Sequence, residues 1–203
     1  MAARVEGVFL NVPFDRQYQS MFYALVFTIH ECGFVARCSL EVEDGSVVRM
    51  EKLYRIIHDC PLGIHDLSRV TLSDNLPRFN MPLELGLFLG AKRWGSRSQR
   101  RKSCVILDRD RYRYQRVCSD IAGQDIRAHE DLPGTAITAV RDWLRAARPA
   151  KALKGGALIE KRFLSFRRDL PSACNRRGLS ERALPFLDYR TLVEMWRDAN
   201  PAS

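Results

Sequence analysis

The sequence has no long apolar run and no leader of the secretory type. No stretch of about 18 consecutive apolar residues occurs among its 203 residues, which argues against a transmembrane helix. The opening segment, MAARVEGVFLNVPF, lacks the charged, apolar and small-residue regions of a signal peptide. We therefore expect a cytoplasmic protein without a membrane partner.

Cysteine and histidine are scattered rather than clustered. The six cysteines show no CxxC spacing, and the four histidines show no metal-ligand spacing. Because a zinc site needs clustered Cys and His ligands, the sequence predicts no metal site. Cysteines that lie in or beside apolar runs are typical of reduced thiols in a core.

Three common phosphate and nucleophile motifs are also missing. The sequence contains no GxGxxG, no GxxxxGK[ST] and no GxSxG. These absences disfavour a standard dinucleotide-binding turn, a P-loop and the nucleophile elbow of a serine hydrolase. We therefore expect none of these sites and no resident cofactor.

The chain carries more basic than acidic residues, and this excess allows two interpretations. Its net charge is +9, and arginine supplies 27 of the 33 basic residues, a skew that genome composition can also produce. The basic residues concentrate in AKRWGSRSQRRKSC and in DRDRYRYQRV, where arginine alternates with tyrosine. A nucleic-acid-binding face stays open on this pattern, but a solvated surface is the favoured interpretation.

The apolar pattern predicts one α/β domain. Apolar residues make up 46% of the chain, enough for a substantial core. Short apolar runs alternate with segments of helical spacing. We expect strands at 8–10, 34–40, 61–69, 103–108 and 124–130, and helices at 17–32, 47–60, from Asn80 onward, 112–123 and 134–149. Such alternation predicts a parallel sheet of about five strands with helices on both faces.

A change in composition divides the chain. The segment AKALKGG, which follows a proline, is typical of a boundary. We therefore expect an α/β domain at residues 1–150 and a C-terminal helical extension at residues 151–203. About 50 residues would be marginal as an independent domain, so the extension is not expected to fold alone.

Polar residues follow the first and third predicted strands and open the helix after the third. In an open parallel sheet, ligands bind at the carboxyl ends of the strands. The three clusters are Asn11, Pro13, Phe14 and Asp15; His65, Asp66, Ser68 and Arg69; and Arg78, Asn80 and Glu84. Their convergence on one edge predicts a ligand site there.

Glu84 is an acid placed among apolar residues near the start of a predicted helix. The positive end of the helix dipole favours a carboxylate, so we expect Glu84 to be ionised near neutral pH. Such a group can attack an anomeric carbon or stabilise an oxocarbenium-like centre. Asp66 would then serve as a second carboxylate, orienting a ribose hydroxyl or acting as acid and base. Glu84 can equally just complement the dipole and reach water.

The other candidates also have structural interpretations. An aspartate that ends a strand often only starts a turn, which applies to Asp66. Asn80 is favoured as a plain N-cap over a ligand contact, with Pro82 in the first turn of the helix. Asn11 and Phe14 fit a turn and a core position as well as they fit a pocket.

Four segments together resemble a known superfamily. GVFLNVPFD, GIHDLSR, RFNMPLELGLFLGAKR and SCVILD are similar to segments of the bacterial TIR-like (Toll/interleukin-1 receptor-like) and nucleoside 2-deoxyribosyltransferase-like superfamily. The resemblance covers about residues 6–108. It implies a flavodoxin-like three-layer fold and cleavage of an N-glycosidic bond in NAD or a related nucleotide or nucleoside, which would be a substrate or ligand and not a cofactor.

The resemblance also implies roles for the candidate residues. Glu84 would be the catalytic carboxylate and Asp66 a ribose or base contact, while residues 11–14 would line the pocket. Members of the TIR-like branch often act in anti-phage defence and self-associate to become active, so a homo-oligomer is expected. Some members bind nucleotides or partners without catalysis, which keeps open a sensing or protein-interaction module.

Overall fold

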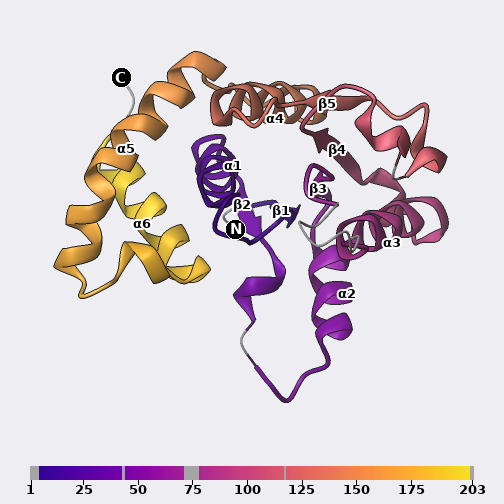
Figure 1. Ribbon diagram of the computed structural model, residues 1–203, viewed down its shortest axis with the longest axis horizontal. Helices are drawn as coiled ribbons and strands as arrows, with labels where there is room; N and C mark the ends of the chain where they lie inside the picture. The colour runs from indigo at the N-terminus through magenta and orange to yellow at the C-terminus, as the bar shows by residue number, and fades with distance from the viewer. Residues whose placement is uncertain (1–4, 43, 71–77, 117, 202–203) are drawn as a thin grey trace.

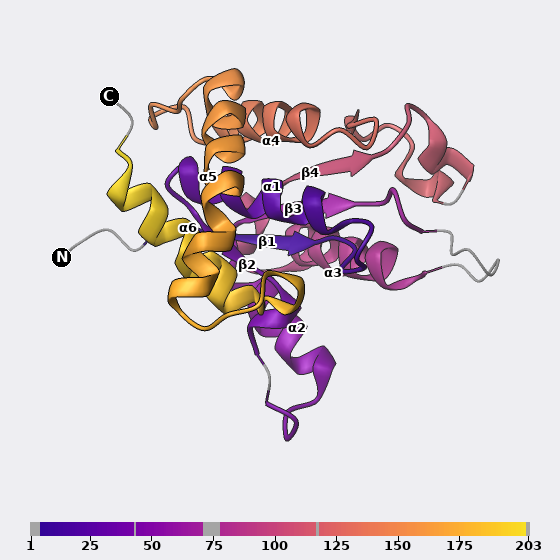
Figure 2. The same cartoon turned by 60° about the vertical axis from the view of Figure 1, so that its left-hand side comes forward.

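A computed structural model describes residues 5–42, 44–70, 78–116 and 118–201. Its centre is one parallel sheet of five strands in the order β2-β1-β3-β4-β5. The strands all point to one edge (Figure 2). They are β1 (Gly7–Asn11), β2 (Val35–Arg37), β3 (Leu62–Asp66), β4 (Ser103–Asp108) and β5 (Ile126–Ala128).

Helices cover both faces of the sheet (Figure 1). One face carries α1 (Gln19–Glu31) and α4 (Pro133–Ala147), which pack against each other. The other carries α2 (Arg49–Asp59) and α3 (Asn80–Trp94). The predicted flavodoxin-like, three-layer α/β fold with about five parallel strands and C-terminal helices is confirmed.

The close approach of α3 to the sheet depends on a glycine. A Cβ atom on Gly63 in β3 would lie 2.9 Å from the Phe88 ring of α3 and 2.9 Å from His65 Nε2. Real Cβ contacts are not that short, so any larger residue would push the helix or the ring away. Phe88 in turn packs edge-on to His65, with ring centroids 5.0 Å apart. Gly63 thus sets how closely α3 packs on β3.

The C-terminal helices pack on α1 and α4 and share their core. They are α5 (Gly156–Arg176), which continues past Pro171, and α6 (Phe186–Ala199). Tyr189 of α6 stacks on Tyr23 of α1 with ring centroids 3.9 Å apart. The Glu31 carboxylate at the end of α1 is completely buried and pairs with Lys154 and Arg162 at 2.6 and 2.7 Å. Residues on both sides of position 150 therefore belong to one hydrophobic cluster.

One predicted helix is absent, and one predicted edge strand is present. The segment 112–123 was expected to be one helix, but its described residues form two short 3-10 helices, η3 (Arg113–Arg116) and η4 (Ser119–Ile121). Tyr112 has a φ of 63°, which a helix cannot include. The Arg113 side chain also bonds the Leu67 and Ser68 carbonyls after β3, which pulls the segment toward the sheet. The edge strand expected within 124–130 is confirmed as β5.

Other boundaries differ by a few residues. The loop expected at 70–79 lies largely outside the described residues, which resume at position 78.

Among the helices that the structure describes, none is both long and apolar enough to cross a membrane.

Candidate active site at the carboxyl edge of the sheet

Asn11 and Asp66 end the neighbouring strands β1 and β3, where the strand order changes direction. Strand β1 pairs with β2 on one side and β3 on the other, and Asn11 lies beside His65 in the register. A crevice forms outside the carboxyl ends of strands at such a switch point. The fold therefore brings the first two predicted clusters to the edge at which α3 begins.

Asn11 connects both strands to the first turn of α3. Its buried Nδ2 group donates to the Met81 carbonyl at 2.8 Å and lies 3.0 Å from His65 Nδ1. Burial lowers the pKa of His65 to about 3, so the ring is neutral and Nδ1 accepts. These bonds fix the N-terminal turn of α3 over the end of β1, and with it the position of Glu84 three residues later.

Glu84 is buried, and its carboxyl group has a higher pKa than we expected. Glu84 is 8% exposed and lies near Cys38 and Arg49, at the carboxyl edge of the sheet. Burial raises the pKa of Glu84 to about 7, although the Arg49 charge acts to lower it. The expectation that the helix dipole keeps this acid fully ionised near neutral pH is therefore wrong. Glu84 lies in the second turn, and the loss of hydration outweighs the dipole.

Asn80 does not have the predicted capping role. Phe79 occupies the N-cap position, so Asn80 is the first helical residue, and among the described residues no side chain caps α3. Asn80 is exposed, whereas Glu84 one turn later is buried. The two residues lie one turn apart on α3, but only Glu84 is shielded from solvent. Pro82 lies in the first turn of α3, as predicted.

Asp66 is completely buried, and its carboxylate is engaged by three groups. Tyr18 donates its hydroxyl to Oδ2 at 2.5 Å, and the Ser68 N–H donates to Oδ1 at 2.7 Å. His129 Nε2 lies 3.1 Å from Oδ2. The Asp131 N–H donates to His129 Nδ1, so the ring proton is on Nε2, the ring nitrogen that lies near the carboxylate. Asp66 therefore joins β3 to the start of α1 and to the end of β5.

These contacts decide the charge of Asp66. Burial by itself would raise the pKa of this carboxyl, but the contacts from His129, Ser68 and Tyr18 outweigh it and hold the pKa below its usual value. A buried carboxylate stays ionised only when its oxygens are satisfied in this way. In this conformation, Asp66 holds three segments together and presents no surface to a ligand.

The remaining candidates surround the start of α1 and the segment before α3. Phe14 is 39% exposed and packs edge-on against Phe22, whereas Pro13 is buried. Arg78 forms an ion pair of 2.9 Å with Asp15, which joins the loop after β1 to the entry of α3. Ser68 is buried, and within the described residues its hydroxyl has no hydrogen-bond partner.

Sequence reasoning missed three residues that shape this edge. Tyr18 and His129 bind Asp66 from positions 48 and 63 residues away along the chain. Arg113 Nε lies 3.1 Å from the buried Asp108 carboxylate at the end of β4. One signal was available, because Asp108 ends the plainest predicted strand and His129 lies near the end of the predicted edge strand. Both therefore belong to the same edge as Asp66.

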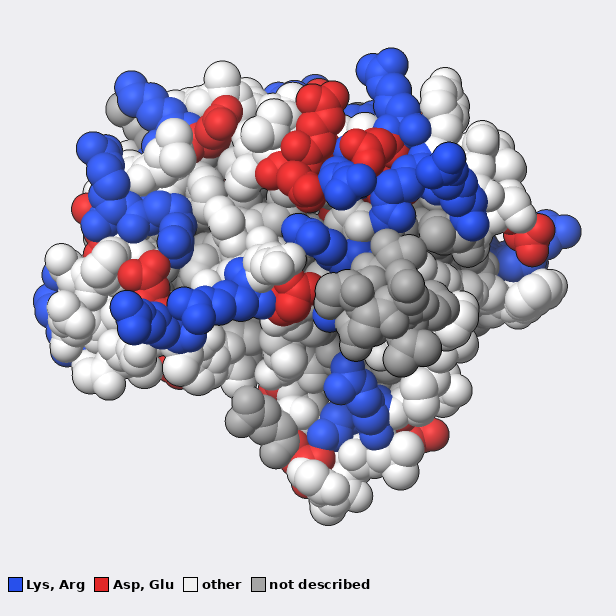
Figure 3. All heavy atoms as spheres, in the orientation of Figure 1, with Lys and Arg blue, Asp and Glu red and all other residues white. Residues whose placement is uncertain are grey.

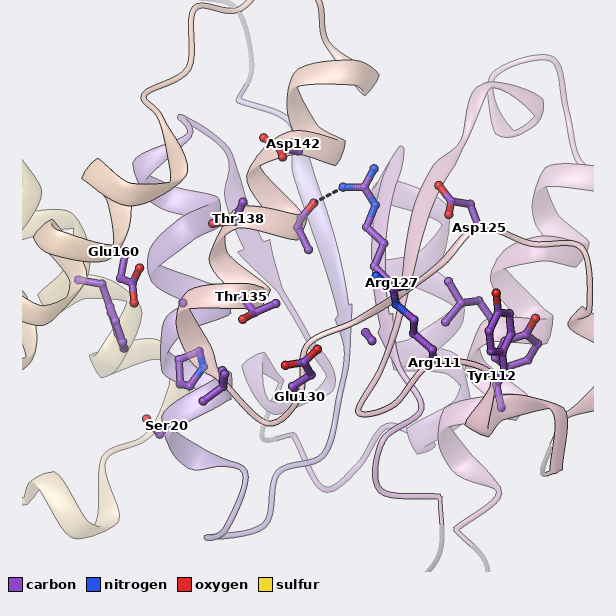
Figure 4. Close-up of a pocket in the computed structure, with 18 of the residues that line it drawn as sticks. Ser20, Arg111, Tyr112, Asp125, Arg127, Glu130, Thr135, Thr138, Asp142 and Glu160 are labelled. Atoms are coloured by element: carbon purple, nitrogen blue, oxygen red, sulfur yellow. Dashed lines mark hydrogen bonds between the residues drawn. The ribbon is translucent and has the colours of Figure 1, made fainter.

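A cavity of about 1200 Å³ lies between β5, α4 and α5 (Figure 4), and Glu84 is not part of its lining. Its lining includes none of the residues that the sequence singled out as a site. Among the described residues, no group of three or more His, Cys, Asp and Glu side chains is placed to hold a metal ion.

No family model matches the sequence, and no curated protein matches it. The similarity of the four quoted segments to the TIR-like and deoxyribosyltransferase-like superfamily therefore stays a prediction.

Proposed function

We propose that this protein cleaves the N-glycosidic bond of NAD or a related nucleotide or nucleoside, as a hydrolase or a transferase. The observation that supports this proposal is the position and the raised pKa of Glu84. It is a carboxyl group of pKa about 7, on the helix that starts over the switch point of the sheet. Groups with such pKa values are the usual acids and bases of active sites at neutral pH.

The arrangement of carboxylates favours a substrate whose base leaves without needing a proton. Asp66 is fully engaged, so Glu84 is the one of these two carboxyl groups that is left for chemistry. Nicotinamide in NAD is linked through a cationic ring nitrogen. When the C–N bond breaks, its electron pair neutralises the ring, and no general acid is required. A neutral nucleoside base would need protonation as it departs.

Glu84 would act at the ribose carbon. As a carboxylate it stabilises the oxocarbenium-like centre while nicotinamide departs. It then accepts a proton from the attacking water, and the net reaction converts NAD and water to ADP-ribose, nicotinamide and one proton. Asn11 positions Glu84 through the first turn of α3, and the half-exposed Phe14 ring offers an apolar surface to a nucleotide base.

A second candidate function is a nucleotide-sensing or protein-interaction module without turnover. It is supported by the low exposure of Glu84 and by the structural role of Asp66, since glycosidic hydrolysis generally employs two available carboxyl groups. Self-association would belong to either function, as would a role in anti-phage defence.

The test is release of nicotinamide from NAD by the purified protein, at low and at high protein concentration. Wild type is compared with Glu84→Gln, and Glu51→Gln, on the exposed first turn of α2, is the matched control. We expect release by wild type and the control, and a loss of at least about 100-fold in the Glu84 variant. Equal release by all three proteins would refute the role of Glu84. Binding of NAD without release by any of them would favour the sensing module.

A further inference from the structure

Within the described residues, the outer edge of β5 has no neighbouring strand, and it forms one wall of the 1200 Å³ cavity. The His129 N–H donates to the Asp108 carbonyl of β4. Backbone N–H and C=O groups alternate in direction along a strand, so the backbone groups of Arg127, two residues earlier, also point toward β4. The backbone groups of Ile126 and Ala128 therefore point away from β4. Within the described residues, no other segment bonds them.

The cavity places this edge beside the first turns of α4 and the side of α5. Figure 4 shows Glu130, Thr135 and Glu160 around the same space, contributed by the loop after β5, by α4 and by α5. The stretch from Gln124 to Ala128 lines the cavity continuously, which corresponds to about 16 Å of extended chain. An exposed edge with a walled groove along it is the arrangement that accepts an added strand.

The charges of the groove are unbalanced in favour of acids. Asp125, Glu130 and Glu160 line it, and none of them forms an ion pair within the described part of the chain. Of its arginines, Arg167 pairs with Glu181, whereas Arg127 donates to the neutral Ala139 carbonyl and keeps its charge, as does Arg111. The three acids without an ion pair therefore exceed the two remaining arginines by one charge.

This excess of acid is local, because the chain as a whole carries a net charge of +9. In Figure 3, acidic side chains gather over α4 and β5 between basic ones. The groove therefore complements a positively charged occupant.

We propose that an extended peptide segment with basic side chains binds in this groove and adds a strand to β5. Its backbone pairs with the outward groups of Ile126 and Ala128. Asp125 precedes the strand and Glu130 follows it, so basic residues near the two ends of a five-residue segment meet acids at both ends of the groove. The site is independent of Glu84 and of the proposed reaction.

The probe is the peptide acetyl-Lys-Val-Thr-Val-Lys-amide, titrated into ¹⁵N-labelled full-length protein and followed by NMR. We expect the amide signals of Ile126 and Ala128 to shift, because their N–H groups gain acceptors. The same peptide with N-methyl groups at both valines removes backbone donors and keeps the charge, and we expect it to bind at least about five-fold more weakly. The Glu-Val-Thr-Val-Glu counterpart should not bind measurably.

Substitutions of the acidic residues test their contribution to binding separately from the backbone pairing with β5. Each exposed charge pair is worth roughly two- to five-fold in affinity, so Glu130→Gln and Glu160→Gln should each weaken binding by that factor, more at low salt. Glu51→Gln, on the opposite face, should leave binding unchanged. Equal binding of the basic and acidic peptides, equal binding of the N-methylated peptide, or no shift at millimolar probe would each overturn the proposal.

Discussion

Replacing Asp66 by asparagine separates a structural from a chemical role for this residue. Asparagine has nearly the same shape but offers one acceptor oxygen and a donor group in place of two acceptor oxygens. In the protein, Oδ1 accepts from Ser68 and Oδ2 faces Tyr18 and His129. Whichever way the amide turns, its NH₂ group meets at least one donor in a fully buried site.

The expected loss of stability follows from these contacts. A hydrogen bond to a charged group contributes about 1.5–3 kcal/mol, and breaking a buried charged network by removing one partner costs roughly 3–5 kcal/mol. We expect Asp66→Asn to lower the free energy of unfolding by about 3 kcal/mol or more. For a chain of 203 residues, this corresponds to a fall in Tm of roughly 10 °C. Tyr18→Phe removes one donor and should cost about 2 kcal/mol.

Urea unfolding at several pH values measures this effect. The folded-state pKa of Asp66 is lowered, so its stabilising effect is present above the unfolded pKa of about 3.9 and is lost as the pH falls through the folded pKa. The difference between wild type and Asp66→Asn should therefore shrink in acid. Asp198→Asn, at an exposed end of α6, is the control and should change stability by less than about 0.5 kcal/mol. A stable Asp66→Asn variant that had lost only ligand turnover would refute the structural role.

Two further predictions concern α3. The folded-state pKa of Glu84 is raised to about 7, so its ionisation destabilises the protein as the pH rises from about 4.5 through 7. Glu84→Gln should accordingly be more stable than wild type at pH 8, by roughly 3 kcal/mol, and indistinguishable at pH 4. Urea unfolding at the two pH values would reveal a failure of this pattern. Gly63→Ala places a methyl group 2.9 Å from the Phe88 ring and should lower the free energy of unfolding by about 1–3 kcal/mol. Gly86→Ala, on the open side of α3, is the control and should raise it by up to about 1 kcal/mol. Equal effects of the two variants in thermal unfolding would contradict the close approach of α3 to the sheet.

The alternation of apolar runs was sufficient to predict the sheet. Strand β4 is a plain apolar run, and α1 shows clear helical spacing, so both lie close to where the sequence indicates. The helix expected at 112–123 failed because its spacing says nothing of the bonds that Arg113 makes to the chain after β3. Such tertiary contacts override a local pattern.

The site was predictable in its place but less so in its chemistry. The sequence put Asn11, Asp66 and Glu84 at one edge, because consecutive parallel strands end together. It did not reveal that the Asp66 carboxylate is bound by side chains of the protein itself, since Tyr18 and His129 belong to distant segments. The ionisation of Glu84 was also misjudged, because the depth of a side chain depends on packing, which a helix position alone does not specify.

The burial of α1 has a consequence for synthesis on the ribosome. Every residue from Met21 to Glu31 is buried, and besides α4 the C-terminal helices α5 and α6 cover part of this helix. About 155 residues separate the end of α1 from the start of α6, which a ribosome adds in roughly 8–30 s at about 5–20 residues per second. During that interval the contacts of α1 with α6 cannot form. The apolar residues of α1 that α6 covers therefore stay exposed on the nascent chain until the last helix is made.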